Sequence, residues 1–352
     1  MRLYIIILVL SYVVTLHGFS SPVTSWKWRG HDIYTEAYNQ PDGEHKPTCI
    51  LLHGFGASTV YYRETIKVLQ QEGYNVHALD LLGQGRSAKP YNEDNSVTNK
   101  VEYSINLWGN MVDDYAKHKQ LDDVVLMGNS IGSLVCLSAA TGDFTDSTTD
   151  TYLAGKVKGL CLFNCGVGLN SRNVIKNPNF NEVQRVLFNS LFDLLNTLIF
   201  DNAVLLRYAL NNVVTKELLK DALTSLYTNS PERVDDELVD SFYYPAKGGE
   251  GCVESIRQIY CNDAGLTPLE YHQKHPEILD HIPLHLIWGK QDSVTPLRGD
   301  VGTFYCDRVA NNRSGNGKTT IDVINSGHIP FDDNPICTHK SMMKWLNSKV
   351  VK

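Results

Sequence analysis

The strongest constraint on the fold is the short turn Gly128-Asn129-Ser130-Ile131-Gly132, which stands between two apolar segments. The segment before it, Asp123–Met127, has the length and apolar character of a buried strand. The segment after it, Ile131–Thr141, is rich in small residues and predicts a helix. A strand that turns sharply into a helix needs residues without bulk beside the turn, and the two glycines meet this need. The pattern therefore predicts that the Ser130 hydroxyl projects from the carboxyl end of a buried strand.

Strands and helices alternate along most of the chain. Short apolar runs of strand length are separated by segments whose apolar residues have helical spacing. Such alternation implies an α/β fold, with a mostly parallel, doubly wound sheet and helices on both of its faces. Besides Asp123–Met127, we expect strands at His31–Tyr38, Thr48–Leu52, Asn75–Leu79, Val157–Phe163, Leu284–Trp288 and Thr320–Ile324, and helices at Tyr61–Gln71 and Val101–His118.

One long interval interrupts this alternation. Asn173–His275 contains no convincing buried strand, but it has helical segments at Glu182–Phe200 and Val213–Tyr227. Because sheet strands are expected on either side of it, we predict a helical cap inserted between two strands and lying over the strand ends. The predicted organisation is a targeting peptide at 1–20, a first part of the core at 21–170, the cap at 171–278 and a second part of the core at 279–352.

The first residues form a separate segment. A short positive start, Met1 and Arg2, precedes the almost wholly apolar run Leu3–Leu16, which matches a secretory signal peptide. The run is shorter than the roughly 20 residues that a membrane-spanning helix needs. We therefore expect entry into the secretory pathway, with an uncleaved anchor or a buried N-terminal helix as alternatives. Phe19, which lies among the small residues Gly18, Ser20 and Ser21, resembles the residue after the cleavage site in proteins of secondary plastids, so a plastid and the cell exterior are the expected destinations.

Composition excludes several classes of protein. Hydrophobic residues make up 42% of the chain and the formal net charge is −7, whereas disordered chains combine low hydrophobicity with high net charge. The acidic balance also argues against a nucleic-acid partner, which would require a basic surface. The sequence has no Cys-x-x-Cys pair, and we expect no metal and no cofactor. In an oxidising compartment Cys252 could pair with Cys261, and Cys306 with Cys337.

A second segment supplies a group that would stabilise negative charge beside Ser130. His53-Gly54-Phe55-Gly56 directly follows the predicted strand Thr48–Leu52. The backbone amide of Phe55 would then lie near the start of the helix Ile131–Thr141. The amide of Ile131, at the start of that helix, has no partner within the helix. Two amides fixed in this way form an oxyanion hole for a tetrahedral intermediate. We therefore predict the amides of Phe55 and Ile131 as its donors.

Two further residues complete a candidate catalytic site. Asp292 lies just past the predicted strand Leu284–Trp288, and His328 follows the last predicted strand. Both positions are at carboxyl ends of strands, so both side chains are expected on the same rim of the sheet as Ser130. A serine nucleophile, a histidine base and an aspartate that orients the histidine form the triad of many acyl-transfer enzymes. The chain order Ser130, Asp292, His328 is the order that such triads have in this architecture.

Together these segments resemble the α/β-hydrolases, specifically their cap-bearing serine members. The resemblance covers the chain from Trp26 onward. Three motifs, Trp26-Lys-Trp-Arg-Gly30, His53-Gly-Phe-Gly-Ala-Ser58 and Gly128-Asn-Ser-Ile-Gly-Ser133, resemble a cyanobacterial and plastid subgroup that includes pheophytinase-like proteins. This resemblance implies the α/β-hydrolase fold and the hydrolysis of an ester such as the phytyl ester of pheophytin.

The predicted function is therefore cleavage of a carboxylic ester of a hydrophobic substrate, of chlorophyll, pheophytin or lipid type, through an acyl-enzyme. The cap sequence is dense in apolar residues, which suits a small hydrophobic ester, and Tyr243, Tyr244 and Tyr260 are candidates for the mouth of its pocket. The N-terminal segment or the cap could also associate with a membrane surface. Two alternatives stay open. One is a carbon–carbon bond hydrolase, since such enzymes often show a similar Gly-Asn-Ser-x-Gly turn, and the other is a non-catalytic ligand-binding protein of the same fold.

Overall fold

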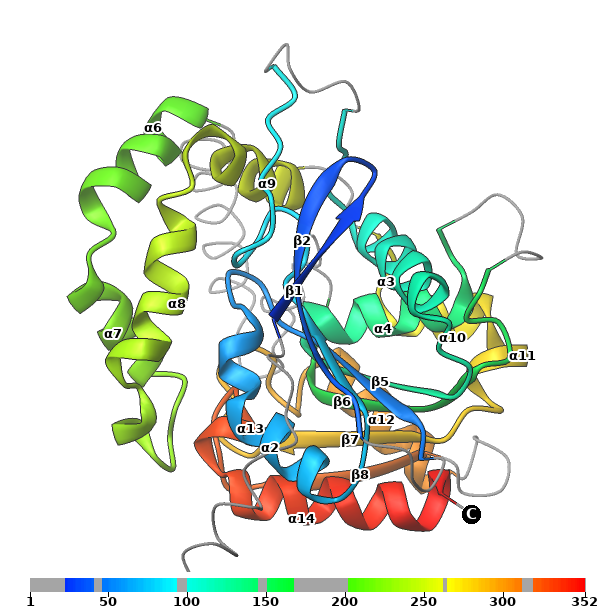
Figure 1. The fold of residues 1–352 in the computed structure, drawn as a ribbon. Helices are drawn as coiled ribbons and strands as arrows, with labels where there is room; N and C mark the ends of the chain where they lie inside the picture. The colour runs from blue at the N-terminus through cyan, green and yellow to red at the C-terminus, as the bar shows by residue number, and fades with distance from the viewer. Residues whose placement is uncertain are drawn as a thin grey trace, which may run out of the picture.

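Figure 1 shows the fold as a computed structural model. The structure describes residues 23–40, 46–93, 100–144, 151–167, 202–261, 265–311 and 319–351. The predicted targeting peptide 1–20 and the predicted helix Glu182–Phe200 lie outside the described residues.

Among the described residues, eight strands form one sheet in the order β1-β2-β4-β3-β5-β6-β7-β8. β1 and β2 form an antiparallel hairpin, β2 is antiparallel to β4, and the other neighbours are parallel. This arrangement confirms the predicted α/β class. The strands are β1 (Val23–Trp28), β2 (His31–Tyr38), β3 (Thr48–Leu52), β4 (Val76–Leu79), β5 (Val124–Ser130), β6 (Val157–Cys165), β7 (Leu284–Gly289) and β8 (Thr319–Ile324).

The strand predictions agree best with the structure in the centre of the sheet. β3 coincides with the predicted Thr48–Leu52 and is buried throughout, because it lies between β4 and β5 with helices on both faces. β5 extends past the predicted end at Met127 as far as Ser130. The structure adds β1 at the edge, where only Trp26 and Trp28 are buried among exposed neighbours, an alternation too short to predict a strand.

Helices cover both faces of the sheet (Figure 1). On one face, α3, α4 and α12 pack against a core that includes Ile50 and Trp108. On the other face, α2, α13 and α14 pack against a core that includes Leu51 and Phe331. Neighbouring residues of β3 enter opposite cores because side chains alternate across a strand. These layers consist of η1 (Thr59–Tyr62), α2 (Arg63–Gln71), α3 (Ile105–Lys119), α4 (Ile131–Thr141), α12 (Asp300–Ala310), α13 (Pro330–Asp333), α14 (Pro335–Trp345) and η6 (Leu346–Val350).

The interval between β6 and β7 is helical in its described part. α6 to α9 stand together on one side of the molecule in Figure 1, and we call residues 202–261, which contain them, the cap. α10 and α11 lie beside α4 instead, and their Tyr271 and Leu279 are buried in the same core as α3 and α4. The interval contains α6 (Ala203–Tyr208), η4 (Ala209–Val213), α7 (Lys216–Thr224), η5 (Pro231–Arg233), α8 (Asp236–Ala246), α9 (Gly249–Cys261), α10 (Pro268–Lys274) and α11 (Pro276–Leu279).

None of the eight cysteines forms a disulfide in the described structure. Cys252 and Cys261 lie at positions in α9 that are about 13 Å apart along the axis, whereas a disulfide needs Cα atoms within about 7 Å. Cys306 belongs to α12 and Cys337 to α14, and these helices cover opposite faces of the sheet. Both pairings that the sequence allows are therefore wrong for this fold.

Within the described ranges, no helix has the length and apolar character needed to cross a membrane.

Candidate active site

The predicted turn around Ser130 is a sharp strand-to-helix elbow. β5 ends at Ser130 and α4 begins at Ile131, and Ser130 itself has φ 54° and ψ −122°, a backbone conformation that non-glycine residues rarely adopt. A Cβ atom added at Gly128 would lie 2.3 Å from the carbonyl oxygen of Gly132, and one added at Gly132 would lie 2.2 Å from that of Leu52. The two glycines are therefore required by close backbone contacts on both sides of the serine.

The loop after β3 lies directly against this elbow. β3 and β5 are parallel neighbours, with Leu52 opposite Gly128, so both strands deliver the chain to the same rim. A Cβ atom added at Gly54 would lie 3.3 Å from the Cβ of Ser130. The backbone of Gly54, next to Phe55, and the first residue of α4, Ile131, thus both lie beside the serine, which is the region where an oxyanion hole requires its donors.

Two side chains from other segments, together with the loop's own His53, fix the loop after β3. The Gly54 amide donates a hydrogen bond to the Tyr61 hydroxyl, and the Gly56 amide donates to Gln84 Oε1 at 2.7 Å. His53 is fully buried. Its Nε2 accepts from the Leu81 amide at 2.9 Å, so its Nδ1 donates to the Gly54 carbonyl at 2.7 Å. These contacts hold the loop before any ligand arrives.

His53 has a structural role rather than a catalytic one. Both of its ring nitrogens are occupied by backbone groups, which fixes a neutral ring with the proton on Nδ1. Burial lowers the pKa of His53, because a charged ring would lose its hydration there. The ring is therefore a rigid support of the loop.

Asp292 and His328 are brought together by the structure. Asp292 follows β7, His328 follows β8, and His328 Nδ1 lies 3.0 Å from each carboxylate oxygen of Asp292. The carboxylate also accepts hydrogen bonds from the Val294 amide at 2.8 Å and the Thr295 hydroxyl at 2.6 Å. Burial alone would raise the pKa of Asp292, but the neighbouring His328 and the hydrogen bonds outweigh burial, so this pKa lies below its ordinary value. Asp292 is thus ionised at neutral pH and can hold an imidazolium.

Asn164, a site residue that the sequence analysis did not identify, supports this pair. It lies near the end of β6 with φ 43°, and its Nδ2 donates both to Asp292 Oδ2 and, at 3.1 Å, to the Gly327 carbonyl. Its Oδ1 accepts from the Gly289 amide at 2.8 Å. One buried amide therefore joins the ends of β6 and β7 to the loop of His328. Its only sequence signal is a polar residue directly after the predicted strand Val157–Phe163.

The serine elbow reaches the histidine loop through Asn129. Its Nδ2 donates to the Phe163 carbonyl at 3.1 Å and to the His328 carbonyl at 3.2 Å. The hydrogen bonds among the described residues do not include one from the Ser130 hydroxyl to His328. The structure thus joins Asp292 and His328 directly, and it joins Ser130 to them through its neighbour.

Of the residues that the structure describes, no three histidine, cysteine, aspartate or glutamate side chains are arranged to hold a metal ion.

The family model described as serine aminopeptidase, S33, matches residues 43–326, which is well over half of the chain. The chain belongs to this family of serine hydrolases. With it comes membership of the α/β-hydrolase superfamily, in agreement with the sheet order and the elbow.

Individual proteins similar to this hydrolase span most of its length. An uncharacterized hydrolase of Bacillus subtilis (strain 168), YugF, is 24% identical over 279 residues, which are 79% of this chain and 83% of YugF. A bromoperoxidase from Bacillus anthracis has a similar structure, with TM-score 0.63 and 13% identity, covering 93% of this chain and 100% of that one. A thermophilic esterase from Thermogutta terrifontis gives TM-score 0.57 and 15% identity, covering 95% and 100%. At these identities the structural matches show the shared fold.

The cap of this hydrolase contacts the loop after β3 through one of the predicted tyrosines. The ring of Tyr260, on α9, lies edge-on to the ring of Phe55, with centroids 5.3 Å apart and planes at 89°. Tyr244, on α8, is 61% exposed and lies beside Lys216 of α7 instead. Aromatic side chains thus cover the loop next to Ser130, whereas Tyr244 faces solvent.

Proposed function

We propose that this protein is a serine hydrolase that cleaves a carboxylic ester of a hydrophobic substrate through an acyl-enzyme. The observation that carries the proposal is the hydrogen-bonded pair of Asp292 and His328, held on the same rim as the strained elbow of Ser130. A serine in this position, an imidazole oriented by a carboxylate and two free amides beside the serine are the groups that acyl transfer requires.

In the proposed mechanism, Ser130 Oγ attacks the acyl carbon while His328 Nε2 takes the hydroxyl proton. Because the Nδ1 of His328 is bonded to Asp292, the tautomer that leaves Nε2 as the base is the favoured one. The oxygen–carbon bond to Ser130 forms, the tetrahedral intermediate collapses, and the leaving alcohol departs with the proton from His328. Water then attacks the acyl-enzyme by the same proton route and releases the acid.

The negative charge that develops on the acyl oxygen would be received by the amides of Phe55 and Ile131. Support comes from the position of Gly54 against Ser130 and from the hydrogen bonds that hold the loop after β3. Donors that need not move during the reaction stabilise the oxyanion most strongly. In this proposal Ser130 would reach His328 by rotation of its own side chain.

For the substrate, we propose an apolar ester of chlorophyll, pheophytin or lipid type. The edge-on pair of Phe55 and Tyr260 provides apolar surface beside the reacting centre. On the outer side of the cap, Val204 and Tyr208 of α6 are 68% and 62% exposed, which would suit contact with a membrane surface that delivers such a substrate. Entry into the secretory pathway through residues 1–20, toward a plastid or the cell exterior, belongs to the same proposal.

The two other candidate functions have weaker support. The Gly-Asn-Ser turn suggests a carbon–carbon bond hydrolase, but Asn129 has a structural role that accounts for it. Its Nδ2 donates to the Phe163 and His328 carbonyls and so holds the turn against β6 and the histidine loop. A non-catalytic binding protein would have no need for the ionised Asp292 against His328. An ester substrate therefore has the stronger support.

A fluorophosphonate probe tests the activated serine directly. The expected result is covalent labelling at Ser130, read from the modified peptide by mass spectrometry, with no labelling in the Ser130→Ala and His328→Ala variants. A phytyl ester, medium-chain esters and a dienoate would then be compared as substrates. Fast turnover of the dienoate with inert esters would favour the carbon–carbon hydrolase, and a folded, unlabelled protein would favour the binding protein.

A further inference from the structure

The first segment of the cap after α7 lies against the loop of the proposed catalytic histidine. The His328 amide donates to the Leu226 carbonyl at 3.0 Å. A Cβ atom added at Gly327 would lie 2.0 Å from the same carbonyl oxygen, so the two backbones touch. We call residues 226–230 the cap hinge, because they join α7 to the rest of the cap at this contact.

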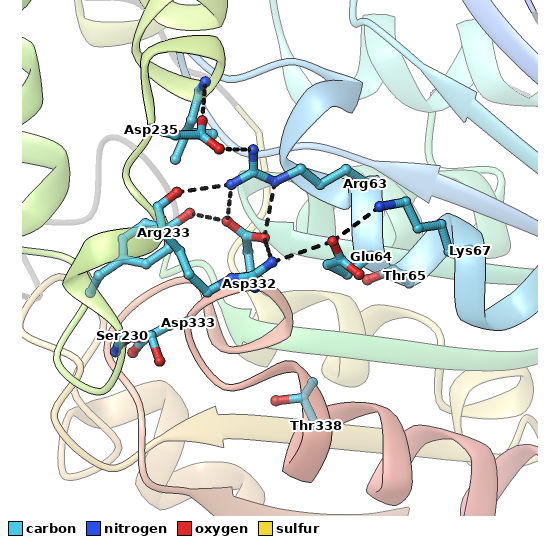
Figure 2. Close-up of polar contacts among 12 residues, drawn as sticks. Arg63, Glu64, Thr65, Lys67, Ser230, Arg233, Asp235, Asp332, Asp333 and Thr338 are labelled. Carbon is cyan, nitrogen blue, oxygen red and sulfur yellow. Dashed lines mark hydrogen bonds and ion pairs between the residues drawn. The ribbon is translucent and has the colours of Figure 1, made fainter.

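A single buried carboxyl group, that of Asp333, bonds to both the cap hinge and the histidine loop. Asp333 is the last residue of α13, five positions after His328, and its side chain is fully buried. Its Oδ2 accepts from the Gly327 amide at 2.7 Å and from the Thr228 amide at 3.1 Å. Its Oδ1 accepts from the amides of Asn229 at 3.0 Å and Ser230 at 2.7 Å. Both oxygens are thus used by two N–H donors each, and Figure 2 shows Asp333 beside Ser230.

The preceding residue, Asp332, anchors the same part of the cap in a different way. It accepts from Arg63 of α2 at 3.4 Å, from Arg233 of η5 at 2.9 Å and from the Tyr227 hydroxyl at 2.8 Å. Arg63 also pairs with Asp235 of the cap, as Figure 2 shows. These contacts hold the cap to the core, and none of them involves Gly327 or His328. Asp332 thus holds the cap hinge at Tyr227 and the next part of the cap at Arg233, whereas Asp333 alone of the two also binds the Gly327 amide.

We propose that Asp333 is a positioning residue for His328 and that it makes the ring orientation depend on a docked cap hinge. Every backbone N–H and C=O group of Gly327 and His328 has a hydrogen-bond partner. The Gly327 amide donates to Asp333 and the His328 amide to the Leu226 carbonyl. The Gly327 carbonyl accepts from Asn164 and the His328 carbonyl from Asn129. Asp333 touches no reacting atom, so it acts only through the Gly327 backbone. The inference rests on the proposed function.

The variant Asp333→Asn tests this role at nearly constant shape. The introduced NH2 group has to face two N–H donors, so either the hinge or the Gly327 amide loses its acceptor. A shift of the histidine of about 1 Å lowers the rate of a positioned reaction by up to about a hundredfold. We expect kcat for a p-nitrophenyl ester and the rate constant of fluorophosphonate labelling to fall together by about tenfold to a hundredfold, with KM changing by less than about threefold.

Asp235→Asn is the matched control, since it removes an ion pair between the cap and Arg63 of α2 without touching the cap hinge or the histidine loop. We expect it to lower the midpoint of thermal unfolding but to keep the labelling rate constant within about threefold of wild type. A second readout is the low-field proton resonance of His328 Nδ1–H, which should broaden or shift in Asp333→Asn and persist in Asp235→Asn. The pH dependence of kcat/KM should change in the first variant only.

Imperfect folding does not obscure the result. Unfolded molecules lower the amplitude of labelling, whereas the rate constant belongs to the molecules that react. Asp333→Glu, which keeps the charge but displaces both oxygens, is expected to show the same loss of rate in weaker form. Wild-type rates and an unchanged resonance in Asp333→Asn would overturn this inference and leave the proposed function standing. An unlabelled wild-type chain would overturn the proposed function, and the inference with it.

Discussion

His328 Nδ1 lies 3.0 Å from both Oδ1 and Oδ2 of Asp292, so the ring N–H is centred on the carboxylate rather than on one oxygen. The two oxygens are not otherwise alike. Oδ1 accepts from the amides of Val294 and Thr295, whereas Oδ2 accepts from the Thr295 hydroxyl and Asn164. Because both oxygens accept hydrogen bonds, the carboxylate is held in one orientation. A carboxylate in this position accepts the proton of Nδ1–H, so His328 takes the tautomer with its proton on Nδ1.

Asp292→Asn should leave the fold intact and remove most of the activity. An amide in this place cannot accept on both atoms, so the ring is held in the wrong tautomer and Nε2 no longer acts as the base. The expected loss in kcat is on the order of 10⁴-fold. Ester turnover and the fluorophosphonate rate measure it, with Asp123→Asn, a change to an exposed aspartate paired with Lys158, as the control. Turnover within tenfold of wild type would show that another group orients His328.

Asn164→Asp should change the pH dependence as well as the rate. In the wild type the pKa of Asp292 is lowered, so this group stays ionised throughout the working range. A second carboxyl group against it would make the cluster bind a proton more readily, because two like charges cannot both ionise at short distance. The acid limb of the kcat/KM profile should therefore move to higher pH.

The control for this change is Asn347→Asp, which adds the same charge at an exposed position near the C-terminus. Its profile should overlay that of the wild type. An acid limb that does not move in Asn164→Asp would mean that Asn164 is not coupled to the catalytic pair, in contradiction to its contacts with Asp292 and the Gly327 carbonyl.

The parts of this protein that the sequence predicts are those with a local physical signal. Thr48–Leu52 has the length and apolar composition of a strand buried on both faces, and Ile131–Thr141 has small residues bounded by a serine and Gly142, which adopts φ 70°. The elbow is equally local, because its two glycines stand within five residues of each other. Asp292 and His328 were predictable because each follows a strand with a clear apolar run.

The supporting residues have no such signal. Asn164 and Asp292 are 128 positions apart, and Asp333 is more than 100 positions from the hinge amides that it binds. Gln84 contacts the Gly56 amide from a loop that has no periodic pattern. Side-chain contacts of this kind depend on how the strands are ordered in the sheet, and that order is not encoded by the spacing of apolar residues in any one segment.

Gly132→Ala should destabilise the protein, because the new methyl group would meet backbone atoms. Its Cβ would lie 2.2 Å from the Leu52 carbonyl oxygen and 2.8 Å from that of His53, and neither oxygen can move without disturbing β3 or the loop after it. The expected loss in the free energy of unfolding is on the order of 2 kcal/mol, from overpacking. Urea unfolding measures it, together with the fluorophosphonate rate.

Gly155→Ala separates the steric effect from the general cost of replacing a glycine. No atom lies within 4 Å of a Cβ at this position, but its φ is 73°, so only the backbone strain of about 1 kcal/mol is expected. Gly155→Ala should also keep the labelling rate of the wild type. Equal destabilisation by the two variants would contradict the close contact between the elbow and β3.

The stability of the fold should decrease in mild acid because several histidines are buried in the neutral form. Burial lowers the pKa of His77, His285 and His339 to about 4 and, together with Arg308, that of His272 to about 3. The unfolded chain binds these protons near pH 6.5, whereas the folded chain does not. The stabilisation is thus complete above pH 6.5 and is lost as the pH falls toward 4, by about 1.4 kcal/mol per pH unit for each histidine.

His272→Phe tests this linkage at one site. Among the described residues neither ring nitrogen of His272 has a hydrogen-bond partner, and the ring packs against Phe304 and Tyr305, so a phenyl ring can replace it. The free energy of unfolding in urea, measured between pH 7 and 4.5, should depend less steeply on pH in the variant, by about 1.4 kcal/mol per pH unit. At pH 7 the two proteins should be similarly stable, because the ring is neutral there in both states. An unchanged slope would mean that His272 takes up its proton in the folded protein, in contradiction to its burial against Phe304 and Tyr305.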